Sequence, residues 1–265
     1  MGLELAKMLF SANGTVYVAA RSAAKIETAT QSIRLAHPDS TGRLESMVLD
    51  LSDLRTIKPA VESFLARETR LDVLVHNAGV MNPPLGSTGA QGHEVQMATH
   101  SLGPFLLTAL LSDRLAETAR GGAPARVVWV TSMISVGAPK GGIVWDEATN
   151  GPKVGKDTME NYMQSKIGSL FLAHEYAKRV AGQGIVSVVS ASPPPAARRT
   201  FRCPVIFVDL HRAGSFVFIS NVSLLERPPR LDEDGAAAPH ARGDGCGHGK
   251  YSWVLAVAGA RYADR

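Results

Sequence analysis

The sequence is poor in cysteine and has no long apolar run. Only two of its 265 residues are cysteines, Cys203 and Cys246, and they form no CxxC motif. This excludes a disulfide-stapled secreted scaffold and favours a reduced, cytoplasmic protein. No stretch reaches the roughly 18 uncharged apolar residues of a membrane-spanning helix. The first residues carry Glu4 and Lys7 at helical spacing, unlike a signal peptide.

Strong charge and a complete set of metal ligands are also missing. The formal net charge is only +4, and the arginine-rich stretch after Ala196 supplies much of it. Nucleic acid is therefore not an indicated partner. His93 and His100 share a helical stretch without a carboxylate or thiol to complete a set, and His240, Cys246 and His248 lie in a low-complexity tail. We expect no metal site.

What the sequence does contain is an alternation of apolar strands and helices up to about Val189. Nearly continuous apolar strands separated by helices predict a doubly wound α/β fold with a parallel sheet. The expected strands are Val16–Ala19, Ser46–Asp50, Leu71–His76, Ala125–Thr131 and Gly184–Ser190, and the expected helices are 3–10, Ala23–Leu35, Ser52–Arg67, His93–Thr118 and Met159–Ala181.

The pattern changes after Ser190. We expect residues 1–190 to form a partial domain of Rossmann type, and residues 191–265 to form an atypical C-terminal region. Pro204–Leu225 holds two β-like apolar runs, whereas Arg227–Lys250 is rich in Pro, Gly and Arg and is expected to be disordered.

Three polar residues follow three successive strands. They are Asp50, Asn77 and Ser132. In doubly wound folds ligands bind outside the carboxyl ends of the strands, so these side chains are expected to converge on one crevice. Each has a simpler alternative as a helix cap or turn residue, and it is their recurrence that indicates a site.

The segment "ENYMQSKIGS" contains the strongest chemical signal. Tyr162 and Lys166 are four residues apart and share one face of the predicted helix. A nearby ammonium lowers the pKa of a phenol, so the pair suits proton exchange with a carbonyl or alcohol. The alternative is an amphipathic helix with an ordinary tyrosine and a snorkelling lysine. Ser132 favours the catalytic interpretation, because its hydroxyl could bind the same substrate oxygen.

The residues after two other strands suit a nucleotide. Gly79 in Asn77-Ala78-Gly79 would let the backbone approach a ligand closely. In Asp50-Leu51 the carboxylate could accept from an adenine amino group. The alternatives are a plain turn and a helix-entry residue.

Together these motifs resemble the short-chain dehydrogenases/reductases, and in detail their retinol-dehydrogenase-like branch with its fungal members. "LDLSDL", "NAG", the strand-end serine, YxxxK, "SLGPFLLTALL" and "GGIVWDEA" carry the resemblance over Gly2 to Val189. It implies strand order 3-2-1-4-5. It also implies a TGxxxGxG loop, of which Gly2 would be the last glycine, with the first strand and the rest of the loop missing here. Val16–Ala19 and Leu71–His76 would then lack their common hydrogen-bond partner.

The resemblance also assigns roles. Ser132, Tyr162 and Lys166 would be catalytic, and the cofactor would contact Gly2, Arg21, Asp50, Leu51, Asn77, Ala78, Gly79, Tyr162 and Lys166. Arg21 follows Ala20, where an acid would bind the 2′-hydroxyl of NAD, so NADP(H) is favoured over NAD(H).

Two segments depart from the family pattern. His100 replaces the usual asparagine that holds a relay water; a histidine can also hold water or relay a proton, or simply line the crevice. Pro195–Thr200 keeps the spacing of a PGxxxT segment with Ala196 for glycine.

These observations predict an NADP(H)-dependent oxidoreductase acting on a small lipophilic carbonyl or alcohol. A non-catalytic remnant or incomplete gene product is the main alternative, and epimerase or dehydratase chemistry with the same Tyr–Lys pair is a further one. Family members pair through the two long helices, so a homodimer is also expected.

Overall fold

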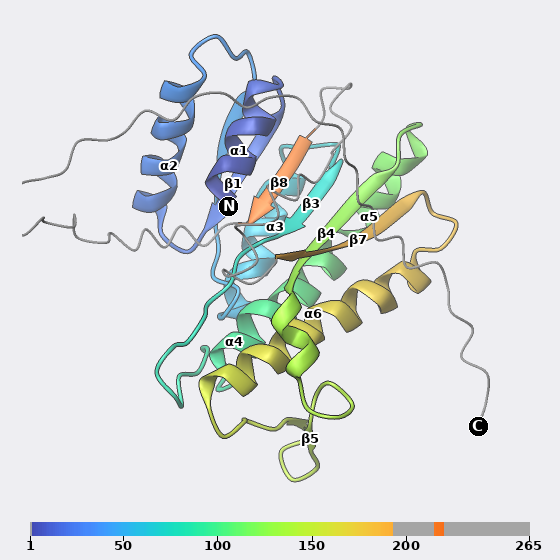
Figure 1. Cartoon of the computed structure of the whole chain (residues 1–265). Helices are drawn as coiled ribbons and strands as arrows, with labels where there is room; N and C mark the ends of the chain where they lie inside the picture. Colours follow the sequence, from blue (N-terminus) through green and yellow to red (C-terminus); the bar gives the residue numbers. More distant parts are fainter. Residues whose placement is uncertain (1, 193–214, 220–265) are drawn as a thin grey trace, which may run out of the picture. The chain divides into compact units, whose positions relative to one another are not determined.

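A parallel sheet forms the centre of the structure. The computed structural model describes residues 2–192 and 215–219. Its main sheet has the order β2-β1-β8-β3-β4-β7, and all neighbouring strands are parallel. The strands are β1 (Thr15–Ala20), β2 (Arg43–Val48), β3 (Val73–His76), β4 (Ala125–Ser132), β7 (Ile185–Ser192) and β8 (Ser215–Ile219). The expected doubly wound α/β class is confirmed (Figure 1).

Strand β8 corrects one expectation. β1 and β3 do not lack a common partner, because β8 lies between them: Ser215–Ile219 pairs with β1 and Phe216–Ile219 pairs with β3. It comes from one of the two β-like runs in Pro204–Leu225. The physical reason is that ladder pairing uses backbone groups, so any extended segment that reaches the gap can fill it.

Alternating side chains of the strands build two cores. In β1, Tyr17 and Ala19 join the cluster on one face of the sheet, while Val16 and Val18 join the cluster on the other. Nearly every residue of β1 is buried, as expected for a strand covered on both faces.

Helices cover both faces. α1 (Gly2–Ser11) and α2 (Ala23–Ala36) pack on one face over β1 and its neighbours, and α3 (Ile57–Leu65), α5 (Gly103–Arg120) and α6 (Thr158–Arg179) supply the core of the other (Figure 1). Ser22 caps α2 by accepting from the Lys25 N–H.

The elements around the site differ from a simple helix–strand alternation. The expected helix His93–Thr118 is divided into the short helix α4 (Val95–Met97), a π-helical turn η2 (Ala98–Leu102) and α5. A 3₁₀ turn η1 (Leu54–Thr56) precedes α3, and another, η3 (Met133–Gly137), follows β4. A small hairpin of β5 (Trp145–Asp146) and β6 (Gly151–Pro152) lies between β4 and α6.

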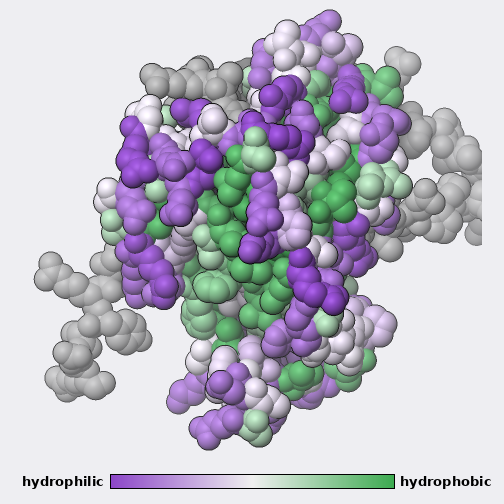
Figure 2. Space-filling view, turned by 180° about the vertical axis from the view of Figure 1, so that it is seen from behind, coloured by the Kyte–Doolittle hydropathy of each residue, from purple (hydrophilic) through white to green (hydrophobic). Residues whose placement is uncertain are grey.

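The surface combines apolar and polar areas. Figure 2 shows a central apolar area bordered by polar side chains on the face seen from behind. Phe105 of α5 and Phe171 of α6 are about half exposed. Neither these helices nor any other in the described ranges has the length and apolarity needed to cross a bilayer.

A proline in the centre of β8 tests its role in the sheet. Val217 pairs with Tyr17 of β1 and Leu74 of β3. Val217→Pro removes a backbone donor from a central strand and should lower the free energy of unfolding by about 3 kcal/mol or more. Val217→Ile, which keeps the N–H and the branched β-carbon, is the control. Urea denaturation of both variants measures the difference, and equal stability would exclude β8 from the sheet centre.

Candidate active site

The carboxyl ends of β1, β2, β3 and β4 meet at one edge of the sheet. Arg21 follows β1, Asp50 follows β2, Asn77 follows β3, and Ser132 is the last residue of β4. Because parallel strands end at the same edge, these residues gather there. The helix α1 returns antiparallel to β1 through a three-residue connection, so its N-terminus at Gly2 lies at this edge too.

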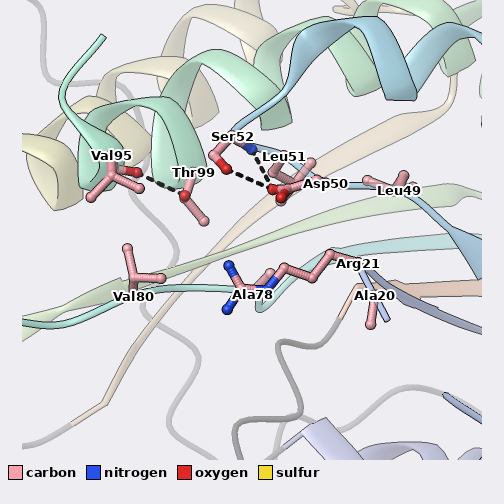
Figure 3. A pocket seen from close by; sticks show the side chains of 10 residues that line it. All are labelled: Ala20, Arg21, Leu49, Asp50, Leu51, Ser52, Ala78, Val80, Val95 and Thr99. Carbon is pink, nitrogen blue, oxygen red and sulfur yellow. Dashed lines mark hydrogen bonds between the residues drawn. The ribbon is translucent and has the colours of Figure 1, made fainter. Parts of the chain in front are cut away.

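A pocket opens between the β1, β2 and β3 ends. Figure 3 shows its lining, with the long Arg21 side chain extending opposite Asp50 and Ser52. Asp50 is held by Ser52, two residues further on: Oδ1 accepts from the Ser52 N–H at 2.9 Å and from the Ser52 hydroxyl at 2.7 Å. The ten lining residues are Ala20, Arg21, Leu49, Asp50, Leu51, Ser52, Ala78, Val80, Val95 and Thr99.

Apolar side chains line the pocket together with the polar residues Arg21, Asp50, Ser52 and Thr99. Its position at the ends of β1, β2 and β3 is where doubly wound folds bind the adenosine half of a dinucleotide. Thr99 turns its hydroxyl to the Val95 carbonyl at 2.7 Å and so presents its methyl group to the pocket. Of the predicted cofactor residues, Arg21, Asp50, Leu51 and Ala78 all line this one cavity.

Ser132 and Tyr162 meet beside this pocket. Asp157 caps α6 by accepting from the Glu160 N–H at 2.8 Å, which sets the start of the helix one turn before Tyr162. Ser132 ends β4, and its side chain hydrogen-bonds with the Tyr162 hydroxyl. The two hydroxyl groups predicted to share a substrate oxygen are therefore already in contact.

Lys166 lies one helical turn after Tyr162. Its Nζ is 5.7 Å from the centre of the Tyr162 ring and donates to the Val130 carbonyl at 3.0 Å. Only 5% of Lys166 is exposed. Burial lowers the pKa of its ammonium group to about 8.

The pKa of Tyr162 moves opposite to the expected direction. Burial raises it, and the hydrogen bond from Ser132 offsets only part of that effect. The Lys166 ammonium is aimed at the Val130 carbonyl and faces the ring of Tyr162, so no lowering of the phenol pKa by the lysine is seen.

Gly79 stands where no side chain fits. A Cβ on Gly79 would lie 2.7 Å from His100 Nε2 and 3.6 Å from Lys166 Nζ. The backbone of the Asn77–Gly79 segment can therefore lie close to the Tyr162–Lys166 helix only with glycine at this position. The close approach that the sequence predicted for Gly79 is therefore made to His100 and Lys166.

His100 is not placed to hold a water. The side chain is 3% exposed, and both ring nitrogens have partners within the protein. Nε2 lies 2.9 Å from the Val80 backbone nitrogen, and Nδ1 lies 2.8 Å from the Ser165 hydroxyl oxygen. Of the alternatives for His100, holding a water does not fit this geometry, and His100 is not among the residues that line the pocket. Ser165 and Val80 carried no signal in the sequence.

Several predicted residues lie outside the described ranges. They are the Pro195–Thr200 segment, Cys203, His240, Cys246 and His248. Within the described residues, no group of three or more His, Cys, Asp or Glu side chains could hold a metal ion.

The fold and the pocket define a doubly wound α/β protein of the dinucleotide-binding kind. The family model described as short chain dehydrogenase matches residues 1–145. The chain belongs to this family. It is 46% identical over 192 residues to the short-chain dehydrogenase/reductase pkfC of Emericella nidulans, covering 71% of this chain and 61% of that protein.

Other relatives agree with this assignment. Human retinol dehydrogenase 12 is 36% identical over 187 residues, covering 71% of this chain and 55% of its own length. The chain thus spans somewhat more than half of these curated relatives. A solved metagenomic short-chain oxidoreductase in complex with NADP has the same fold, with a TM-score of 0.54 at 21% identity over 83% of this chain and 90% of that one.

Replacing Gly79 tests the close approach of the loop to α6. Gly79→Ala should lower the free energy of unfolding by about 1–3 kcal/mol, because the methyl group displaces a buried, hydrogen-bonded histidine ring. Gly151→Ala is the matched control, since its Cβ would meet nothing nearer than 3.9 Å. Thermal or urea unfolding measures both, and an unaffected Gly79→Ala variant would show that the loop is not tightly packed.

Proposed function

We propose that the protein is an NADP(H)-dependent oxidoreductase that interconverts a carbonyl and an alcohol on a small lipophilic substrate. The observation that carries the proposal is the hydrogen bond between Ser132 and Tyr162, with Lys166 beside them and a pocket at the same sheet edge. Membership of the short-chain dehydrogenases supports it.

The residues present fit a dinucleotide at its adenosine end. The unbonded part of the Asp50 carboxylate and the backbone at Leu51 would hold the adenine, and Ala78 and Gly79 would line the path toward Tyr162. The N-terminus of α1 at Gly2 offers backbone donors to a pyrophosphate. Tyr162 and Lys166 would hold the nicotinamide ribose, and the bound nicotinamide supplies or accepts the hydride.

Tyr162 would act as the proton donor to a carbonyl. Burial raises its pKa above the ordinary value of a phenol, so the hydroxyl carries its proton at neutral pH and can donate it to the oxygen on which negative charge develops. Ser132 would donate a hydrogen bond to the same oxygen and so stabilise the negative charge that develops there. The Lys166 ammonium lies 5.7 Å from the centre of the Tyr162 ring, near enough to bind a ribose hydroxyl beside it.

Arg21 is the basis for the NADP(H) preference. It is exposed at the pocket margin directly after β1, where a 2′-phosphate would lie, and a guanidinium binds phosphate through paired hydrogen bonds. A solved relative named as the RhlG/NADP complex of Pseudomonas aeruginosa, at 25% identity and a TM-score of 0.52 over 75% of this chain and 71% of that one, agrees with this choice.

The proposal includes a cytoplasmic protein and a homodimer. Exposed Phe105 on α5 and Phe171 on α6 support an interface through these helices. The substrate is a small molecule, and lipophilicity is inferred from relatives such as retinol dehydrogenase 12.

Removing the Tyr162 hydroxyl tests the chemistry. Tyr162→Phe should lower kcat by about 10²–10⁴-fold, because the proton donor is lost, while NADPH binding stays nearly unchanged. Tyr176→Phe is the matched control: Tyr176 is on the same helix and hydrogen-bonds Ser112. The measurement is NADPH oxidation with a panel of aldehydes and ketones, beside NADPH binding by fluorescence. An unaltered chain that neither binds NADPH nor turns over would favour the non-catalytic remnant.

Charge removal at Arg21 tests the cofactor choice. Arg21→Ser should lower the ratio of NADPH to NADH affinity by about 10–100-fold, since a charge-assisted contact to the 2′-phosphate disappears. Arg34→Ser, on the exposed face of α2, serves as the control and should leave the ratio unchanged. Fluorescence titration with NADPH and with NADH measures both affinities. An unchanged ratio of the two in Arg21→Ser would refute the role of Arg21 in cofactor choice.

A further inference from the structure

The π-helical turn η2 connects two parts of the proposed active site. His100 lies in this turn, and its imidazole is inserted between the loop after β3 and the helix α6. Backbone and side-chain contacts fix the turn on α6: Ser169 donates to the His100 carbonyl at 2.9 Å, and Ser101 donates to the Ser165 carbonyl at 3.1 Å. π-turns of this kind are frequent at functional sites.

The hydrogen bonds determine the tautomer of His100. The Val80 backbone N–H can only donate, so Nε2 must accept and carry no proton. The Ser165 hydroxyl donates to the Tyr162 carbonyl at 2.8 Å, so it accepts from His100, and the imidazole proton is on Nδ1. The Val80 N–H thus donates to His100, His100 donates to the Ser165 hydroxyl, and that hydroxyl donates to the Tyr162 carbonyl.

A protonated imidazole does not fit this arrangement. An Nε2–H would point at the Val80 N–H, and the ring is buried near the Lys166 ammonium. Burial and the charge on Lys166 accordingly lower the pKa of His100 well below its usual value. Two ionisable groups of α6 face the imidazole. The Tyr162 ring lies edge to face with it at a centroid distance of 5.6 Å, and the charge of Lys166 acts on it.

The chain of hydrogen bonds does not serve as a proton relay. It ends on the backbone carbonyl of Tyr162, which cannot pass a proton on, and the ring is almost fully buried. The function of the imidazole must therefore lie in the positions of the groups that it joins.

We propose that His100 is a positioning residue that fastens the Asn77–Val80 loop to the helix carrying Tyr162 and Lys166. One face of the proposed cofactor site is backbone of this loop, and the other is α6. The imidazole sets the spacing between them, and Gly79 allows that spacing because a Cβ would meet Nε2 at 2.7 Å. The kinetic consequence rests on the proposed function, whereas the hydrogen-bond assignment does not.

Two variants separate the polar role of His100 from its bulk. His100→Phe keeps a planar ring and removes both hydrogen bonds. His100→Gln can accept from Val80 through its carbonyl and donate to Ser165 through its amide. His93→Phe, an exposed histidine just before α4, is the matched control.

The first readout needs no activity. Amide hydrogen exchange of Val80 should accelerate about tenfold or more in His100→Phe and stay within about threefold of the unaltered chain in His100→Gln. Nitrogen NMR of the unaltered protein should show a pyrrole-type Nδ1 and a pyridine-type Nε2 at neutral pH. A protonated Nε2, or a Val80 amide that exchanges equally fast in all forms, would overturn the assignment.

The second readout is kinetic. His100→Phe should weaken NADPH binding and lower kcat, each by about tenfold, and His100→Gln should recover most of both. Failure of His100→Gln to recover NADPH binding while His100→Phe folds normally would also overturn the proposal. If the unaltered chain does not bind NADPH, the proposed function fails, and exchange and NMR still decide on His100. If His100→Phe does not fold, the test rests on Val80 exchange in His100→Gln and on the tautomer of His100 that NMR shows in the unaltered protein.

Discussion

Unbroken backbone pairing across the middle of the sheet is the constraint on which the rest of the structure depends. β1 is buried on both faces, so its peptide groups need partners in the sheet. β8 supplies them on one side and satisfies β3 on its other side. The pocket lining comes from both halves of the sheet: Arg21 and Asp50 from the β1–β2 side, Ala78 and Val80 from the β3 side. Without β8 the two halves of the proposed nucleotide site would not be fixed relative to each other.

The catalytic part depends on a second kind of contact, made between helices. The π-turn around His100 and the helix α6 are joined through serine hydroxyls and one imidazole, and the glycine of the Asn77–Gly79 loop completes the fit. Burial then sets the chemistry: it keeps Tyr162 protonated and lowers the pKa of Lys166 to about 8. Ser132 contacts Tyr162 because β4 ends beside the first turns of α6.

Much of this was accessible from the sequence because it follows from simple periodicities. Apolar runs predicted β1, β3, β4 and β7. The rule for parallel strand ends predicted that Asp50, Asn77 and Ser132 share one crevice; all three lie at the same sheet edge, but of the three Asp50 alone lines the pocket. β2 was shifted toward the N-terminus from its predicted range, since a half-exposed edge strand has no continuous apolar run. The spacing of Tyr162 and Lys166 predicted a shared face, and the structure places them together.

The predictions that were wrong concern properties that depend on the three-dimensional environment of a residue and not on its neighbours in sequence. No rule links "SFVFI" to a gap between two distant strands, because pairing is independent of side-chain identity. The direction of the Tyr162 pKa follows from burial outweighing charge, which a spacing cannot express. The partners of His100 come from two other elements, so its role could not be inferred from position alone.

The most direct test of this account is amide hydrogen exchange of the unaltered chain, read for β1 and β3 together. The account predicts that the amides of Val16–Ala19 and Val73–His76 exchange at similarly slow rates, because β8 joins both strands into one cooperative unit. Rapid exchange of β1 beside a protected β3 and β4 would contradict it. The centre of the sheet would then be open, and the two halves of the nucleotide pocket would not be held together.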